Sequence, residues 1–184
     1  SRAPGYALTL PSSAVDAWEF ESLVRSAAGT GRADLERALG LWRGPAFAEV
    51  AGEHWALAEI ARLEELRVVA RERVVAAAVA SGDAAGAVLD AQSLTRDHPF
   101  REEGWRLLAL ALHRSGRQAD ALAALREARG RLASELGLDP GPGLTELEHR
   151  ILTGTVPSAP APAPAPVPVD TAPAPWFLGP APGW

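Results

Sequence analysis

The chain has 184 residues, 47% of them hydrophobic, and its 18 basic and 23 acidic side chains give a formal net charge of −5. This size fits one domain and a tail, and the lack of cysteine excludes disulfides and thiol chemistry. No apolar run reaches the roughly eighteen residues of a membrane-spanning helix, and without clustered positive charge the chain is expected to bind DNA poorly by itself.

The N-terminal residues predict a turn and one short strand. Tyr6, Leu8 and Leu10 alternate with small or polar residues, the pattern of a strand with one buried face. Because a lone strand has no partner, residues 1–11 are interpreted as the last strand of a domain that precedes them. No basic segment is followed by an apolar run, so we expect no secretory signal and a cytoplasmic location.

Two short helices and a loop are predicted next. The first begins near Asp16, carries one apolar stripe, and ends at residues 29–31, where two glycines flank a threonine. The second runs from about residue 33 to 42 and is stopped by Gly44-Pro45. In the loop that follows, Phe47 and Val50 are expected to pack against the core.

A long helix is predicted from about residue 53 to 81. Its apolar residues form a wide band, and its glutamates and arginines form a solvated charged face. The band comprises Trp55, Ile60, Leu63, Leu66, Val69 and Val74.

The segment 71–133 contains an internal repeat. Ser81-Gly82 recurs as Ser115-Gly116, and the small residues that follow recur with the same spacing of 34 residues. This is the period of the tetratricopeptide repeat, in which a helix pair buries its apolar face only by stacking on its neighbours. The alternative is two amphipathic helical hairpins in a generic bundle.

The later copy supplies the structural positions of such a repeat. Bulky residues lie on one face of its first helix, about 101–115, and alanines allow a close crossing in its second helix, about 117–136. The expected positions are Trp105, Leu108, Gly116, Ala121, Leu125 and Ala128. The earlier copy places its second helix at about 83–97.

The C-terminal part predicts a cap and then an extended tail. Gly137 closes the preceding helix, and residues 139–143, an Asp followed by alternating Pro and Gly, form a rigid turn. A short helix over 144–152 has one apolar face that caps the stack. From Pro157 the composition changes, and prolines alternate strictly with alanine over residues 160–166, which predicts an extended linker or a disordered tail. Trp176, Phe177 and Trp184 there are typical either of a docking peptide or of an unstructured end.

The sequence contains no pattern that is typical of a catalytic site or a metal site. His54, His98, His113 and His149 are scattered and no pair has ligand spacing on one helix. A phosphate-binding G-x-x-x-x-G-K-[ST] loop is impossible because lysine is absent. We therefore expect neither catalytic residues nor a cofactor nor a metal.

A candidate partner groove lies on the first helix of the later repeat, because the first helices of such repeats line the concave surface. Its residues would be Glu103, Arg106, Leu110, His113 and Arg114. Arg106 and Arg114 would hold an acidic partner or a chain terminus. The alternative is that these arginines form ordinary surface pairs with Glu102 or Glu103.

Several motifs in order resemble the bacterial transcriptional activator domain of SARP-type regulators of antibiotic gene clusters. The match covers about residues 5–152. Its motifs are Gly5-Tyr6, Leu41-Trp42-Arg43-Gly44, Arg62-Leu63-Glu64-Glu65-Leu66, His98-Pro99-Phe100-Arg101-Glu102, Arg114-Ser115-Gly116-Arg117 and Glu135-Leu136-Gly137.

The resemblance implies an all-α, tetratricopeptide-like right-handed superhelix of about seven helices. Residues 1–11 would be the residual last strand of a winged-helix domain, 12–153 the activator domain, and 154–184 a Pro/Ala-rich linker or tail. The resemblance also implies that a side chain near positions 141 and 143 caps the last helix. Because this sequence has glycine at both positions, the cap of that helix is expected to fray.

Two functions remain open. The first is a regulatory module that supports self-association and contact with RNA polymerase, while DNA is bound only through the preceding winged-helix domain. The second is a free-standing helical-repeat scaffold that binds a peptide or protein. The strand at residues 5–10 favours the first, because a self-contained scaffold has no use for it. Neither function predicts a membrane partner.

Overall fold

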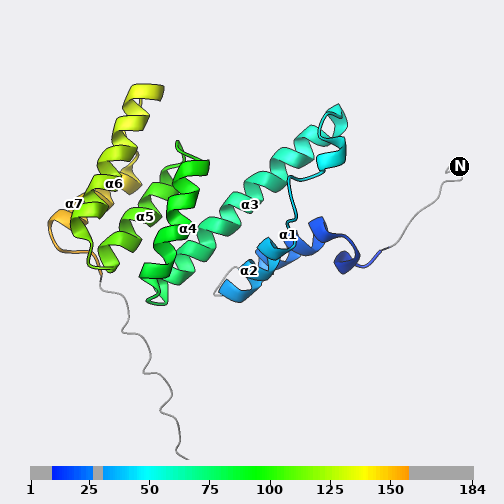
Figure 1. Ribbon diagram of the computed structural model, residues 1–184, viewed down its shortest axis with the longest axis horizontal. Helices are drawn as coiled ribbons and strands as arrows, with labels where there is room; N and C mark the ends of the chain where they lie inside the picture. The colour runs from blue at the N-terminus through cyan, green and yellow to red at the C-terminus, as the bar shows by residue number, and fades with distance from the viewer. Residues whose placement is uncertain (1–9, 27–30, 158–184) are drawn as a thin grey trace, which may run out of the picture.

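The computed structural model describes residues 10–26 and 31–157, and Figure 1 shows them as a row of helices. Seven α-helices and no strand occur in these ranges. The helices are α1 (Asp16–Ser26), α2 (Arg32–Gly40), α3 (His54–Ala80), α4 (Ala84–Asp97), α5 (Glu102–Arg114), α6 (Gln118–Arg131) and α7 (Pro142–Leu152). Short 3-10 helices η1 (Ser12–Ala14) and η2 (Ala48–Val50) precede α1 and α3, and the short π-helix η3 (Leu132–Leu136) extends α6.

Consecutive helices pack as hairpins, and the hairpins stack side by side from α1 and α2 at one end to α6 and α7 at the other (Figure 1). The first helices of successive hairpins also touch, because α3 contacts α5 and α5 contacts α7. The predicted all-α stack of helical hairpins is confirmed. The predicted N-terminal strand and the aromatic tail lie outside the described residues, apart from Leu10.

The repeat period of the sequence is also the period of the structure. The backbone N–H of Asp83 donates to the carbonyl of Ala78 at 2.9 Å, and 34 residues later Arg117 donates to Leu112 at the same distance. Between them Gly82 and Gly116 have φ of 91° and 79°. Only glycine adopts this left-handed conformation without steric penalty, so the two turns require it.

Alanine allows the repeat helices to approach closely. Ala91 on α4 and Ala121 and Ala128 on α6 have no exposed surface, and they belong to the larger core together with Trp105, Leu108 and Leu125. A smaller core is formed by Phe20, Leu23, Val24, Leu35 and Ala38 of α1 and α2 against α3. The long helix α3 therefore serves both cores from opposite sides.

Two sequence expectations about large apolar residues are wrong. Trp55 is 68% exposed, because Ala56 takes the inward position in the first turn of α3. Phe47 is 42% exposed and sits in the left-handed region at φ 51°, which turns its side chain away from the core. Val50 is half-buried.

The final helix does not fray as expected, since α7 begins at Pro142 and buries Leu144, Leu147 and Ile151. The outer positions of α7, such as Thr145 and His149, are exposed and polar. This arrangement closes the stack in the way that a terminal repeat requires.

Trp105 should be the most sensitive aromatic residue of the later repeat. It is 4% exposed, its indole N–H donates to the Pro99 carbonyl at 2.8 Å, and the Arg131 guanidinium lies over its ring. Trp105→Ala is expected to lower the free energy of unfolding by roughly 3–5 kcal/mol. Urea titration followed by circular dichroism measures this change.

The matched control is Trp55→Ala, because Trp55 is largely exposed. Its effect should stay within about 0.5 kcal/mol. Equal losses in the two variants would contradict the assignment of Trp105 to the core.

Candidate partner-binding surfaces

The predicted groove residues lie on the least buried stripe of α5. The arginines among them, however, are hydrogen-bonded to other groups of this chain. Arg106 donates to Glu103 from Nε and from Nη2, both at 2.7 Å. The hydrogen bonds from Arg106 to Glu103 raise the pKa of the guanidinium. This is the surface pair that the sequence offered as the alternative to partner binding.

Arg114 is also occupied within the chain. Its Nη1 donates to the Val79 carbonyl at 2.9 Å, at the C-terminal end of α3 where backbone carbonyls lack helical partners. Its Nη2 lies 3.5 Å from the Pro157 carbonyl. Leu110 packs half-buried against the larger core and His113 is half-buried beside it. Arg114 and Leu110 therefore hold α5 against its neighbours, whereas Arg106 is paired within α5. A role of these residues in holding a partner stays a prediction.

The motif His98–Glu102 forms a joint between α3 and α5. Glu72 on α3 is only 7% exposed, and Arg101 donates to its two carboxylate oxygens at 2.6 and 3.1 Å. Arg101 also donates to Glu65 at 2.7 Å. Hydrogen bonding to Glu72 raises the pKa of Arg101. Because an unpaired buried carboxylate is strongly unfavourable, this pair fixes how α5 sits on α3.

The next residue of the motif holds the last helix. Both carboxylate oxygens of Glu102 accept from the Gly141 N–H, at 2.9 and 3.2 Å. This carboxylate satisfies a backbone donor at the start of α7 and meets the positive end of the helix dipole. A Cβ at Gly141 would lie 3.0 Å from Glu102 Oε2, so glycine makes room for a cap supplied by another helix.

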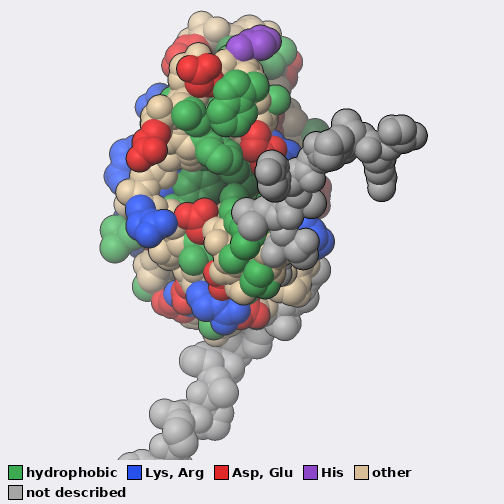
Figure 2. All heavy atoms as spheres, turned by 90° about the vertical axis from the view of Figure 1, so that its right-hand side faces the viewer, with side chains coloured by type: hydrophobic (Ala, Val, Ile, Leu, Met, Phe, Trp, Pro, Cys, Tyr) green, Lys and Arg blue, Asp and Glu red, His purple; other side chains and the backbone are tan. Residues whose placement is uncertain are grey.

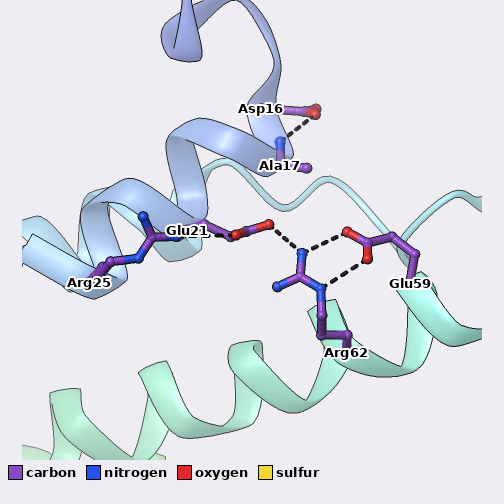
Figure 3. Close-up of polar contacts among 6 residues, drawn as sticks. All are labelled: Asp16, Ala17, Glu21, Arg25, Glu59 and Arg62. Atoms are coloured by element: carbon purple, nitrogen blue, oxygen red, sulfur yellow. Dashed lines mark hydrogen bonds and ion pairs between the residues drawn. The ribbon is translucent and has the colours of Figure 1, made fainter.

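Charged contacts also hold the N-terminal helices on the stack. Arg62 on α3 bridges Glu21 of α1 and Glu59 of its own helix, as Figure 3 shows. Hydrogen bonding to Glu59, then to Glu21, raises the pKa of Arg62. On α2, Arg32 pairs with Asp83 at 3.0 Å, the residue that caps α4 through the Gly86 N–H. These pairs are half-exposed, and each is expected to contribute little stability.

A pocket of about 540 Å³ that the sequence did not predict lies at the end of the molecule that carries α1. Phe20, Trp42 and Leu63 line it together with residues 43–50 of the loop before α3. Figure 2 shows hydrophobic side chains gathered along this face between charged ones. In the sequence, Leu41–Gly44 contributed to the family resemblance and Gly44-Pro45 marked a helix end, and neither pattern indicated a pocket.

A second pocket, of about 380 Å³, lies where α2, α3 and α4 meet. Arg67 and Arg71 line it, facing Glu36 and Asp90. Arg67 lies over the Trp42 ring, 4.5 Å from its centroid, and Arg71 pairs with Asp97 at 2.8 Å. Both arginines are engaged, so this pocket offers mixed charge and no excess of either sign. None of the predicted groove residues lines either pocket.

Two further searches cover only the described part of the chain. No group of three or more histidine, aspartate or glutamate side chains there is placed to hold a metal ion. No helix there is long and apolar enough to cross a membrane.

Comparison with known proteins decides the family. The family model described as "Bacterial transcriptional activator domain" matches residues 15–152. The chain belongs to this family. The activator-domain resemblance seen in the sequence motifs is thereby confirmed.

Relatives of this activator domain are regulatory proteins. The chain is 41% identical over 160 residues to the regulatory protein AfsR of Streptomyces griseus, covering 83% of this chain and 16% of AfsR. It is 36% identical over 156 residues to the regulatory protein DnrI of Streptomyces peucetius, covering 80% of this chain and 57% of DnrI. The chain thus spans less than two thirds of the length of these relatives.

A solved structure shares the fold of the activator domain. Mycobacterium tuberculosis EmbR, solved in complex with a low-affinity phosphopeptide, matches with a TM-score of 0.78 and 33% identity. The match covers 85% of this chain and 44% of the EmbR chain.

The Arg101–Glu72 pair should behave as a buried ion pair. Arg101→Met leaves the Glu72 carboxylate buried without its partner, so stability should fall by roughly 3–5 kcal/mol. The double variant Arg101→Met/Glu72→Leu should recover most of the loss, because it removes the stranded charge. Urea titrations of both variants measure this.

The matched control for this prediction is Arg117→Met, which breaks the exposed Arg117–Asp120 pair. Its effect should not exceed about 1 kcal/mol. If the double variant is as unstable as Arg101→Met, the loss of stability does not come from a stranded Glu72 carboxylate.

The cap from Glu102 can be tested by hydrogen exchange at α7. Glu102→Ala should weaken the protection of the first α7 amides by about 0.5–2 kcal/mol, and Gly141→Ala should act similarly by displacing the carboxylate. The control is Gly143→Ala, whose Cβ would make an ordinary 3.7 Å contact with Arg106. Equal exchange in Gly141→Ala and Gly143→Ala would refute the cap.

Proposed function

We propose that the chain is the regulatory and interaction module of a bacterial transcriptional activator of the SARP type. Its relatives are named as regulatory proteins, and its fold is a stack of helical hairpins, an architecture suited to holding other proteins. The single observation that supports the proposal most is the family match over residues 15–152.

In the proposed arrangement the chain contributes protein contacts and another part of the protein contributes DNA binding. The net charge is −5, and the arginines of α5 are engaged with Glu103 and with backbone carbonyls. Base readout requires side chains held in a groove of the duplex. We therefore assign DNA recognition to a winged-helix domain preceding residues 1–11, and self-association and RNA polymerase contact to residues 12–153. Residues 154–184 would serve as the linker.

The second candidate is a free-standing scaffold that recognises a peptide. The structural relative EmbR was solved with a phosphopeptide, which favours this alternative for a helical-repeat protein. At the predicted groove a phosphate would have to displace the Glu103 carboxylate already bound to Arg106, which weakens the case for that site.

DNA binding separates the two functions. In a gel-shift assay at low salt, the present chain should give no sequence-specific retention of promoter DNA, since the proposal assigns the groove-reading element to the preceding domain. A longer polypeptide that includes the preceding domain should be retained specifically. The measured quantity is the fraction shifted on the promoter relative to a scrambled duplex.

The regulatory role is tested by removing residues 13–152 from that longer polypeptide. Transcription from the promoter should fall, because the contacts with a second copy or with polymerase are lost. Specific retention by the present chain alone would overturn the division of labour. Full activation without residues 13–152 would overturn the regulatory role.

A further inference from the structure

The apolar pocket beside α1 carries one unbalanced charge. Its volume of about 540 Å³ falls in the range of natural binding pockets, roughly 300–1,000 Å³. Three charged side chains line it, those of Asp16, Arg43 and Glu49. Asp16 and Arg43 pair with each other at 3.1 Å, whereas Glu49 forms no ion pair within the described part of the chain. The lining therefore favours a ligand that brings one positive charge together with apolar surface.

An exposed aromatic ring lines the same pocket as this carboxylate. Phe47 stands directly before η2, the short helix that carries Glu49. Its backbone holds φ 51° and ψ 40°, which is unfavourable for a bulky residue, and its side chain is 42% exposed. Backbone strain of this kind clusters at ligand-binding sites. A ring and a carboxylate together attract an ammonium or guanidinium group, the ring through its π face and the carboxylate through its charge.

The loop that presents these two side chains is fixed by hydrogen bonds. The Ala46 N–H donates to the Glu64 carboxylate of α3 at 3.0 Å. Within the loop, the Val50 N–H donates to the Phe47 carbonyl at 2.9 Å, and the Glu53 N–H donates to the Val50 carbonyl at 3.0 Å. A preorganised loop loses little conformational entropy when a ligand binds.

The two aromatic side chains of the loop region have different roles. Trp42 meets Phe20 edge-on, with ring centroids 5.3 Å apart, and the Arg67 guanidinium lies 4.5 Å from its centroid. Phe47 has neither a ring contact nor a cation against it among the described residues. Trp42 therefore forms the apolar wall of the pocket, and Phe47 remains available to a ligand.

We propose that this pocket binds a peptide segment of a partner protein that carries a large apolar side chain next to an arginine or lysine. The apolar side chain would pack against Phe20, Trp42 and Leu63. The neighbouring cation would lie against Phe47 and pair with Glu49.

A second acidic residue favours an extended peptide over a compact small molecule. Glu53, at the cap position before α3, is exposed, has no ion pair among the described residues and does not line the pocket. Figure 2 shows acidic side chains interspersed with the hydrophobic ones on this face. A ligand that reaches both the pocket and Glu53 has to continue along the surface, as a peptide chain does. The binding is a property of this chain alone, whereas the assignment of the peptide to a partner in transcription rests on the proposed function.

Three matched probes test the proposal. The first is the dipeptide N-acetyl-leucyl-argininamide, the second replaces arginine by citrulline, which has the same shape without the charge, and the third replaces leucine by glycine. Each is titrated into the isotope-labelled chain, and binding is followed by NMR at the backbone amides and at the Trp42 indole. The arginine probe should bind roughly fivefold more tightly than the citrulline probe and more tightly than the glycine probe, and it should shift the amides of residues 43–50.

Variants of the chain assign the preference to its side chains. Glu49→Gln should remove most of the preference for arginine over citrulline. Phe47→Leu, which keeps an apolar side chain but removes the π face, should weaken the arginine probe by about twofold to fivefold and the citrulline probe less. The matched control is Glu135→Gln, because Glu135 on η3 is also exposed and without an ion pair in the described part of the chain. This control should keep the full preference.

Four results would overturn the proposal. Equal affinities for the arginine and citrulline probes would exclude the carboxylate, and shifts confined to other parts of the chain would exclude the pocket. Argininamide alone, binding as tightly as the dipeptide, would assign the pocket to a small organic cation. A longer polypeptide with the preceding domain that fails to bind a probe bound by the present chain would show that this domain covers the pocket. None of these results depends on DNA binding, so they are distinguishable from a failure of the proposed function.

Discussion

The structure depends most on the carboxylate of Glu72, which is buried in the middle of the long helix α3. A buried charge requires a partner with several hydrogen bonds, and Arg101 supplies two of them from the turn before α5. Next to this turn, the indole N–H of Trp105 donates to the Pro99 carbonyl, and the Glu102 carboxylate accepts from the Gly141 N–H at the start of α7. The turn before α5 thus supplies the partner of the buried carboxylate, and the residues next to it anchor Trp105 and cap the last helix.

The sequence predicted the elements that follow local rules. The period of 34 residues identified the repeat, because Gly82 and Gly116 are required by equivalent turns and the buried alanines by equivalent crossings. The side chains of the predicted groove were harder to place. Whether Arg114 extends into solvent or caps α3 depends on where Val79 lies, 35 residues away, and no spacing along α5 encodes that contact.

The errors at Phe47 and at the last helix have a common cause. Hydrophobicity alone predicted burial for Phe47, but its left-handed backbone turns the ring outward. The glycines at 141 and 143 predicted a missing cap, but the cap comes from Glu102 on another helix. The backbone conformation decides the exposure of Phe47, and a contact between distant residues decides the cap of α7, and neither can be read from hydrophobicity or glycine content alone.

The distribution of charge bears on how such a domain can regulate. Several arginines described above act between elements, as Arg62 of α3 does for Glu21 of α1 and Arg101, in the turn before α5, for Glu72 of α3. Motif residues that carry the family resemblance, such as Arg101, Glu102 and Gly116, are therefore accounted for by the framework of the stack. A shared framework cannot by itself distinguish one partner from another. Partner choice in this chain is then expected to reside in features that the framework does not use: the apolar pocket with its strained Phe47, and exposed residues such as Trp55 and Leu89.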